Sequence, residues 1–257
     1  SRPVEEIIKE LDMLSERNVR EITLLGQNVN SYRGIDTHSE KTMNFPALLQ
    51  AVSAACAKQD VIRWIRFISS HPKDLSDELI EVMAEDRRIC KALHLPVQHG
   101  SDAILARMNR SYTVAQYLKT IEKLRRRIPD IVLTTDILIG FPGETQEDFE
   151  QTLNLMRKVQ FDSAFMYHYN PREGTKAYDF PDRISDSERI NRLQQVIDLQ
   201  QSITEQKMQT RLGTTATVLI ESQSRNNSDE LFGNTEQGEI AVLIERCDFE
   251  CIGHFMQ

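Results

Sequence analysis

Polar residues that could do chemistry recur along this chain, each group directly after a short apolar run. Gly26, Gln27 and Asn28 form the first group, and their two amide side chains could bind a zwitterion such as an amino-acid moiety without adding charge. The alternative is an ordinary turn with Asn28 in the left-handed region. Ser70 and His71 form the second group, where His71 could carry a proton or could be a structural histidine.

The third group lies in residues 96–102, between an apolar run and a helical pattern. Gln98 and Ser101 could bind a ribose and a carboxylate, with Arg107 one or two turns into the helix. The alternative role of Ser101 or Asp102 is to cap that helix.

Two further groups lie within or directly after the last two apolar runs. Asp136 lies inside an apolar run, and a buried carboxylate is unfavourable without a partner, so Asp136 needs a partner or a catalytic role. The glycine-containing segment 140–145, which includes Phe141, would let the backbone approach a planar ligand, and its last residue, Thr145, could cap the next helix. Arg172 could bind a carboxylate or phosphate; the alternative is a surface arginine. His94, inside a strand pattern, is predicted to be a core histidine.

The cysteines provide no complete metal motif. Cys56 and Cys90 lie singly in apolar surroundings, which favours buried free thiols. Cys247 and Cys251 have the spacing C-x3-C, which offers two potential ligands and no second pair. The sequence therefore predicts no metal ligands in this chain.

Helical and strand patterns alternate from residue 3 to residue 208, which predicts βα units and a parallel sheet. The expected strands are residues 21–25, 62–68, 92–95, 131–139 and 163–169, and the expected helices are residues 4–16, 45–57, 75–84, 117–127, 146–159 and 185–210. A polar loop is expected over residues 30–42. Parallel βα folds carry their chemistry after the carboxyl ends of the strands, where all these groups lie.

The helix at residues 4–16 precedes the first strand, which implies a strand further upstream and six βα units in all. After residue 213 the pattern changes to short alternating runs at 216–222 and 239–244, separated by a turn at 226–229. We expect an α/β partial barrel over 1–212 and a truncated small β-barrel over 213–257. With no initiator Met, the chain is expected to be a fragment of a longer protein.

Composition places the chain among ordinary globular proteins, with 257 residues, 40% hydrophobic residues and 27% charged residues. It excludes collagen-like, disordered and membrane classes, and no signal peptide or apolar run of about 18 residues is present. A cytosolic location is predicted. The net charge of −8 gives no global attraction to nucleic acid. Lys119 and residues 123–127 could form a local basic patch or a solvated helix face.

Five segments together resemble the radical-SAM methylthiotransferases in order and spacing: residues 24–30, 69–72, 94–98, 135–145 and 172–175. The Gly26-Gln27-Asn28 form is more similar to the type that modifies isopentenyladenosine in tRNA than to the type that modifies a ribosomal-protein aspartate. The resemblance implies a partial (βα)6 radical-SAM barrel followed by a TRAM β-barrel. It also implies that an N-terminal domain and a C-x3-C-x2-C loop, which binds a [4Fe–4S] cluster, are absent from this chain.

For the intact protein, the resemblance implies a transferase that adds a methylthio group to C2 of N6-isopentenyladenosine 37 in tRNA. The implied cofactors are S-adenosylmethionine and two [4Fe–4S] clusters, and the implied partners are the tRNA anticodon loop and a reductant. A cytoplasmic monomer with no membrane partner is expected, and the fragment alone is expected to be inactive. The implied cofactor-binding residues are Gly26, Gln27, Asn28, Ser70, Gln98, Ser101, Arg107, Ile139 and Phe141, and Asp136 and Arg172 would face substrate or cofactor.

Two other classes of function stay open on the residues alone. The chain could be an RNA-binding or partner-binding module without catalysis, which predicts tRNA binding without upstream cysteines. It could also be an ordinary βα-barrel enzyme with His71 and Asp136 as acid and base, which predicts activity without iron. Within the resemblance, a ribosomal-protein aspartate is the alternative substrate.

Overall fold

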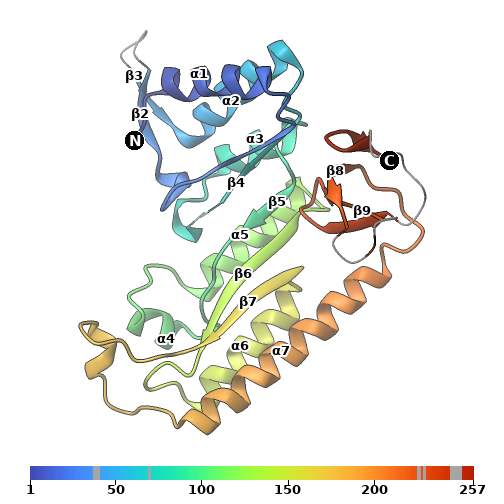
Figure 1. The fold of residues 1–257 in the computed structure, drawn as a ribbon. Helices are drawn as coiled ribbons and strands as arrows, with labels where there is room; N and C mark the ends of the chain where they lie inside the picture. Colours follow the sequence, from blue (N-terminus) through green and yellow to red (C-terminus); the bar gives the residue numbers. More distant parts are fainter. Residues whose placement is uncertain (37–40, 69–70, 225–226, 228–229, 244–250) are drawn as a thin grey trace.

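A curved parallel sheet forms the centre of the molecule (Figure 1). The computed structural model describes residues 1–36, 41–68, 71–224, 227, 230–243 and 251–257. The strands are β1 (Glu21–Leu24), β4 (Trp64–Phe67), β5 (Ala92–His94), β6 (Val132–Ile139) and β7 (Ser163–His168). β1 pairs with β4 and β5-β6-β7 pair in turn. A parallel bridge between Ile65 and Ile89 joins the two groups, so neighbours in the sheet follow one another along the chain.

The helices cover the convex face of this sheet (Figure 1). They are α1 (Val4–Glu16), α2 (Phe45–Gln59), α3 (Asp77–Glu85), α5 (Val114–Arg127), α6 (Gln146–Val159) and α7 (Asp186–Gln209), with the short α4 (Asp102–Arg107) after β5. All six predicted helices are present. α5 begins three residues earlier than predicted, because Thr113 and Gln116 form a capping box there.

The two faces of each central strand differ in environment. Leu133, Ile137 and Ile139 of β6 are fully buried against the helices. The alternate residues of β6, among them Asp136, are half-buried on the concave face. On β7, Phe165 pairs in register with Asp136. The concave face therefore carries polar and aromatic side chains, while the apolar core lies on the other side.

A hairpin occupies the segment that the sequence predicted as a polar loop. β2 (Arg33–Asp36) and β3 (Lys41–Asn44) pair antiparallel, with Arg33 opposite Asn44. Met43 of β3 packs against the core, but the other residues of these strands are mostly polar, so no hydrophobic alternation indicated them. Single 3-10 turns lie at η1 (Val29–Ser31), η2 (Pro72–Asp74) and η3 (Lys176–Asp179).

A separate antiparallel sheet follows α7, in the order β10-β9-β8-β11. Its strands are β8 (Val218–Gln223), β9 (Leu231–Thr235), β10 (Ile240–Leu243) and β11 (Phe255–Met256). The strands expected over 216–222 and 239–244 are present, whereas β9 and β11 were not predicted. Most of the turn expected at 226–229 lies outside the described residues.

The small sheet packs on the amino-terminal end of β4 (Figure 1). The ring centroids of Trp64 and Phe255 are 4.8 Å apart. Arg66 donates hydrogen bonds to the carbonyl oxygens of Thr235 and Glu236, at 2.8 and 2.7 Å. The small sheet thus lies at the opposite end of the strands from the loops that carry the predicted site residues. Among the described residues, no helix is long and apolar enough to cross a bilayer.

Candidate functional site

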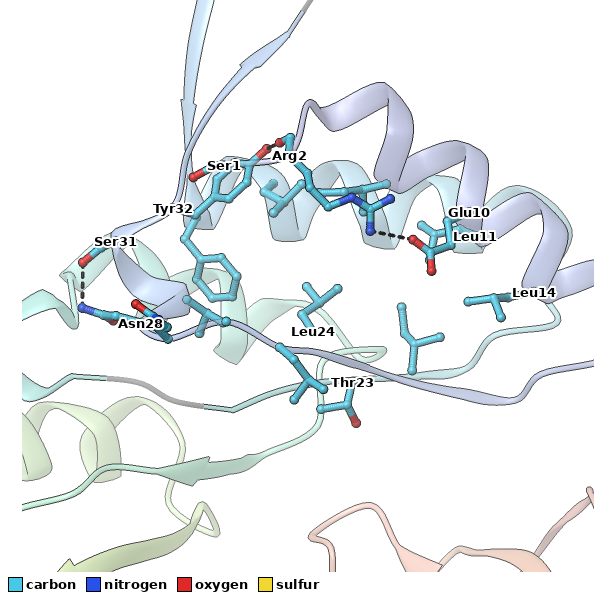
Figure 2. Close-up of a pocket in the computed structure, with 18 residues that line it drawn as sticks. Ser1, Arg2, Glu10, Leu11, Leu14, Thr23, Leu24, Asn28, Ser31 and Tyr32 are labelled. Atoms are coloured by element: carbon cyan, nitrogen blue, oxygen red, sulfur yellow. Dashed lines mark hydrogen bonds and ion pairs between the residues drawn. The ribbon is translucent and has the colours of Figure 1, made fainter.

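A cavity of about 720 Å³ lies beside the carboxyl-terminal end of β1 (Figure 2). Leu11 and Leu14 of α1 and Leu24 of β1 give it an apolar wall, and Asn28 and Ser31 lie at its polar end. Gly26 and Gln27 also line it. The first predicted group of polar residues therefore opens onto a space large enough for a small-molecule ligand.

Asn28 presents an unused acceptor at the polar end of the cavity. Its Nδ2 donates to Ser31 Oγ at 2.7 Å and to Asp74 Oδ2 at 2.6 Å, while its buried Oδ1 has no partner among the described residues. Burial raises the pKa of Asp74, but the hydrogen bonds from Ser31 and Asn28 outweigh burial and the pKa is lowered. The φ of Asn28 is −151°, so the left-handed turn offered as the alternative is wrong.

Asn30 was not predicted to be functional, yet both its amide atoms lack a partner among the described residues. Its exposed fraction is only 6%. A buried amide without hydrogen bonds is unfavourable, so Asn30 is an exception among the buried polar side chains of the described residues.

His71 has a structural role in the described part of its segment, whereas Ser70 lies outside the described residues. The His71 Nδ1 accepts the Lys73 N–H at 3.2 Å, and the His71 ring packs edge-on against Tyr112. Burial, with help from nearby Arg110, lowers the pKa of His71. These contacts agree with the structural alternative for this histidine.

The loop after β5 continues alongside β6, which places Gln98 beside Asp136. Gln98 has a φ of +68°, in the left-handed region that non-glycine residues rarely adopt. Its N–H donates to the Asp136 carbonyl oxygen at 2.9 Å, and its carbonyl oxygen accepts the Leu138 N–H at 2.8 Å. A strained residue held by its neighbours on both sides is typical of a ligand-binding loop.

The partner that Asp136 requires is His94. His94 Nε2 lies 3.5 Å from Asp136 Oδ1, and His94 Nδ1 lies 2.9 Å from the Thr134 hydroxyl. The prediction of a core histidine is wrong, because the His94 side chain is 19% exposed and lies on the concave face. Asp136 itself is 28% exposed, which leaves its carboxylate accessible to a ligand.

Ser101 and Arg107 lie on either side of the short helix α4. The buried Ser101 hydroxyl accepts the Ile104 N–H as the helix cap and donates to Asp148, so the capping alternative describes the contacts it makes here. The exposed Arg107 places its guanidinium against Gly143 and 5.1 Å from the ring centroid of Phe180. Arg107 thus reaches the loop after β6.

The Ile139 and Phe141 side chains point away from solvent. Their exposed fractions are 0% and 5%, so only their backbone could face a planar ligand. Gly140 between them has a φ of +69°, and a Cβ there would lie 2.5 Å from Arg189. Arg172 lies in an exposed turn after β7, and its guanidinium has no partner among the described residues.

The described cysteines do not form a metal site. Burial raises the pKa of the Cys56 thiol to about 11 and that of Cys90 to about 12, which keeps both protonated. Cys247 lies outside the described residues. The described part of the chain has no group of three or more His, Cys, Asp or Glu side chains that could hold a metal ion.

Sequence reasoning missed two features of the strand ends. Phe165 and Tyr167 of β7 are 57% and 54% exposed beside Asp136 and Leu138, which strict alternation along β7 could have indicated. A buried network of charged side chains also joins the loops after β5 and β6, and its members are too far apart in sequence for any spacing to indicate it.

Residues 1–156 match the model of the Radical SAM superfamily, which is more than half of the chain. The chain belongs to this superfamily. The predicted partial radical-SAM barrel followed by a small sheet is thereby confirmed as the fold class. Most of the polar strand ends described above lie within the matched residues.

Several curated relatives of this radical SAM chain share one name. The chain is 60% identical over 256 residues to the tRNA-2-methylthio-N(6)-dimethylallyladenosine synthase of Treponema pallidum (strain Nichols), covering 100% of this chain and 56% of that protein. A protein of the same name in Treponema denticola is 57% identical over 255 residues, covering 99% and 56%. The chain therefore spans about half the length of these curated relatives.

Solved structures support the fold alone. Coproporphyrinogen III oxidase (HemN) from Escherichia coli, a radical SAM enzyme, has a TM-score of 0.52 at 14% identity and covers 92% of this chain and 61% of its own. The radical S-adenosylmethionine methyltransferase TsrM from Kitasatospora setae has a TM-score of 0.50, also at 14% identity, over 65% of this chain and 31% of its own.

Proposed function

We propose that this chain is part of a radical-SAM methylthiotransferase that adds a methylthio group to C2 of N6-isopentenyladenosine 37 in tRNA. The observation that carries the proposal is the 60% identity over 256 residues to a synthase named for that product. The polar ends of β1, β5, β6 and β7 supply the place where such chemistry would occur. Because the relatives are longer, the activity is proposed for the whole protein.

The strand ends fit S-adenosylmethionine. Asn28 lines the cavity with Gly26 and Gln27, and a methionine ammonium group could pair with its Oδ1, which is buried and has no partner among the described residues. The left-handed Gln98 and the accessible Asp136 carboxylate offer hydrogen bonds to a ribose, and the unpartnered Arg172 guanidinium offers charge to a carboxylate or phosphate. When bound in enzymes of this superfamily, S-adenosylmethionine supplies the oxidising power that removes a hydrogen atom from the substrate.

The described residues do not fit a [4Fe–4S] cluster. Such a cluster needs thiolate ligands, and the described part of the chain offers no set of three ligands. We propose that the ligands of both clusters, and the contact with a reductant, belong to the remainder of the longer protein. No step of the reaction is assigned to this chain's cysteines.

This chain's own groups bind and orient the reactants. Asp136, held 3.5 Å from His94, can accept a hydrogen bond from a sugar hydroxyl or an exocyclic amine. The exposed ring of Phe165 lies beside them on the concave face, 5.9 Å from the His94 ring. Ser101 and Arg107 remain proposed cofactor residues, and Ile139 and Phe141 would contribute through their backbone.

Part of the basic run on α5 is paired with acidic side chains of α3. Lys123 is paired with Asp77 of α3 at 2.7 Å, and Arg127 bonds Glu81 at 2.8 Å. Charges neutralised in this way attract phosphate weakly. We propose that the anticodon loop is bound by the site loops and by the remainder of a monomeric, cytoplasmic protein.

Nucleoside mass spectrometry of tRNA tests the proposal. Deleting the full gene should remove the 2-methylthio mark and leave isopentenyladenosine in its place. Plasmid copies of the full gene carrying Asp136→Asn or Arg172→Ala should fail to restore the mark. A matched copy with Arg126→Ala, whose guanidinium is 69% exposed on α5, should restore it. An unchanged nucleoside profile after deletion would reject the tRNA substrate and favour a ribosomal-protein aspartate.

A further inference from the structure

Three charged or titratable side chains form a buried network under the loops after β5 and β6. His99 belongs to the first loop, Glu144 to the second and Arg192 to α7, and their exposed fractions are 0%, 4% and 6%. His99 Nε2 lies 3.2 Å from Glu144 Oε2, and Arg192 donates to Glu144 Oε1 at 2.8 Å. Charges this deeply buried persist only where each is hydrogen-bonded.

The hydrogen bonds give the histidine one orientation. His99 Nδ1 accepts the backbone N–H of Ser101 at 3.0 Å, so the ring proton lies on Nε2 and is donated to Glu144. Burial lowers the pKa of Arg192, but its hydrogen bonds to Glu144 and Glu188 outweigh burial and the pKa is raised. Arg192 therefore carries the positive charge that keeps the Glu144 carboxylate stable.

The same carboxylate holds the backbone of the second loop. Glu144 Oε2 accepts the N–H of Gly140 at 2.5 Å and that of Phe141 at 3.2 Å. Gly140 is in the left-handed region, which glycine adopts freely, and the two hydrogen bonds from Gly140 and Phe141 to Glu144 fix the turn in that conformation. His99 in turn follows Gln98 directly, and Gln98 has its own left-handed backbone.

We propose that His99 and Glu144 are positioning residues that tie the loop after β5 to the loop after β6, so that Gln98 and the Gly140–Phe141 backbone face S-adenosylmethionine in one fixed arrangement. The proposal rests on the proposed function, because it assigns those two loops to that cofactor. Neither side chain touches the ligand; both act through backbone that does.

Two substitutions of His99 separate positioning from packing in the full-length protein. In His99→Gln the amide nitrogen can replace Nε2 as donor to Glu144, which preserves the tie. In His99→Asn the side-chain oxygen can replace Nδ1 as acceptor for Ser101, but the tie to Glu144 is lost. Each variant loses one hydrogen bond and the ring, so both should lower the melting temperature similarly.

The measurement is the dissociation constant of S-adenosylhomocysteine, by calorimetry on the purified protein. We expect His99→Asn to weaken binding about tenfold, because the groups that contact the ligand are then misplaced. The dissociation constant of His99→Gln should stay within about twofold of that of the unaltered protein. Glu21→Gln removes the negative charge of an ion pair at the far end of the strands, 2.8 Å from Arg66, and should lower stability without changing binding.

Equal weakening by both His99 variants would show a general packing defect and overturn the proposal, as would unchanged binding in both. If the unaltered protein itself does not bind S-adenosylhomocysteine, the proposed function fails and the inference fails with it. That result is distinct from the others, because it appears before any substitution is made.

Discussion

Replacing Arg66 with methionine should undock the small sheet before the barrel unfolds. The Arg66 guanidinium makes two bonds to Glu21, at 2.8 and 3.1 Å, and two to the Thr235 and Glu236 carbonyl oxygens. Its side chain is 14% exposed and that of Glu21 is 20% exposed. Arg66→Met therefore leaves a largely buried carboxylate and two carbonyl groups without their donor.

The expected cost is about 3 kcal/mol, the lower end of the range for breaking a buried pair, because Glu21 keeps some contact with water. At about 2–4 °C per kcal/mol for a domain of this size, the transition should fall by about 6–12 °C. Removing both charges in Arg66→Met, Glu21→Leu should recover part of the loss, since no unpaired charge then remains.

Trp64 is the chain's single tryptophan, so its fluorescence reports on the contact between β4 and the small sheet. Trp64 packs on Phe255 of β11, and the Arg66 guanidinium lies 5.4 Å from its ring centroid. Trp64 fluorescence should shift to the red at a lower temperature in Arg66→Met than in the unaltered chain. The shift should also precede the loss of helical circular dichroism.

Arg126→Met is the matched control, because Arg126 and Glu122 form a surface ion pair in which each side chain is 69% exposed. Surface pairs contribute about 0–1 kcal/mol, so the fluorescence transition should move by no more than about 4 °C. If Arg66→Met moves it no further than Arg126→Met does, the small sheet is not held by Arg66 and the reasoning is refuted.

Three further experiments, two titrations and one labelling, test the surroundings of His71, of Asp74 and of the two buried cysteines. His71, whose pKa burial lowers, should titrate below 6.5 by NMR, and the folded state should lose stability as the pH falls, because the unfolded histidine takes up its proton first. Asn28→Ala removes a hydrogen bond from Asp74, so the pKa of that carboxyl should rise in carbon-13 spectra. Cys56 and Cys90, with pKa values of about 11 and 12, should resist iodoacetamide in mildly alkaline buffer, as read by mass spectrometry.

Each of these expectations has its own control. His71→Asn should reduce the acid sensitivity of unfolding; an identical pH profile would contradict the assignment to His71. In Asn28→Ala the pKa of Asp148 should stay lowered, because its hydrogen bonds come from Ser101 and Thr145 and not from Asn28. Denaturant should make both thiols react at once, and labelling of the folded chain would show that they are not buried.

The sequence predicted the central strands and helices because apolar periodicity records burial. The alternation in β6 marks the buried Ile137 and Ile139 as clearly as the structure does. The β2–β3 hairpin was missed because its strands are mostly polar and show no apolar alternation. The sequence also placed most polar site residues correctly at the carboxyl ends of strands, since that position depends only on strand order.

What the sequence could not predict is which polar side chains meet. The need of Asp136 for a partner was evident from its apolar surroundings, but His94 lies 42 positions earlier and pairs with it only because β5 and β6 are adjacent. His99 and Glu144 are similarly distant along the chain. Such contacts follow from the sheet register, which single-sequence patterns do not determine.

The sequential order of the sheet has a consequence for how the molecule folds. β1 pairs with β4, a bridge from Ile65 to Ile89 leads on toward β5, and β5, β6 and β7 pair in turn, so the sheet can grow one βα unit at a time as the ribosome delivers it. Docking of the small sheet is different, because Arg66 must find carbonyl groups 169 and 170 positions later. Loop closure over that distance is slow, so the hydrogen bonds of Arg66 to Thr235 and Glu236 should be among the last to form.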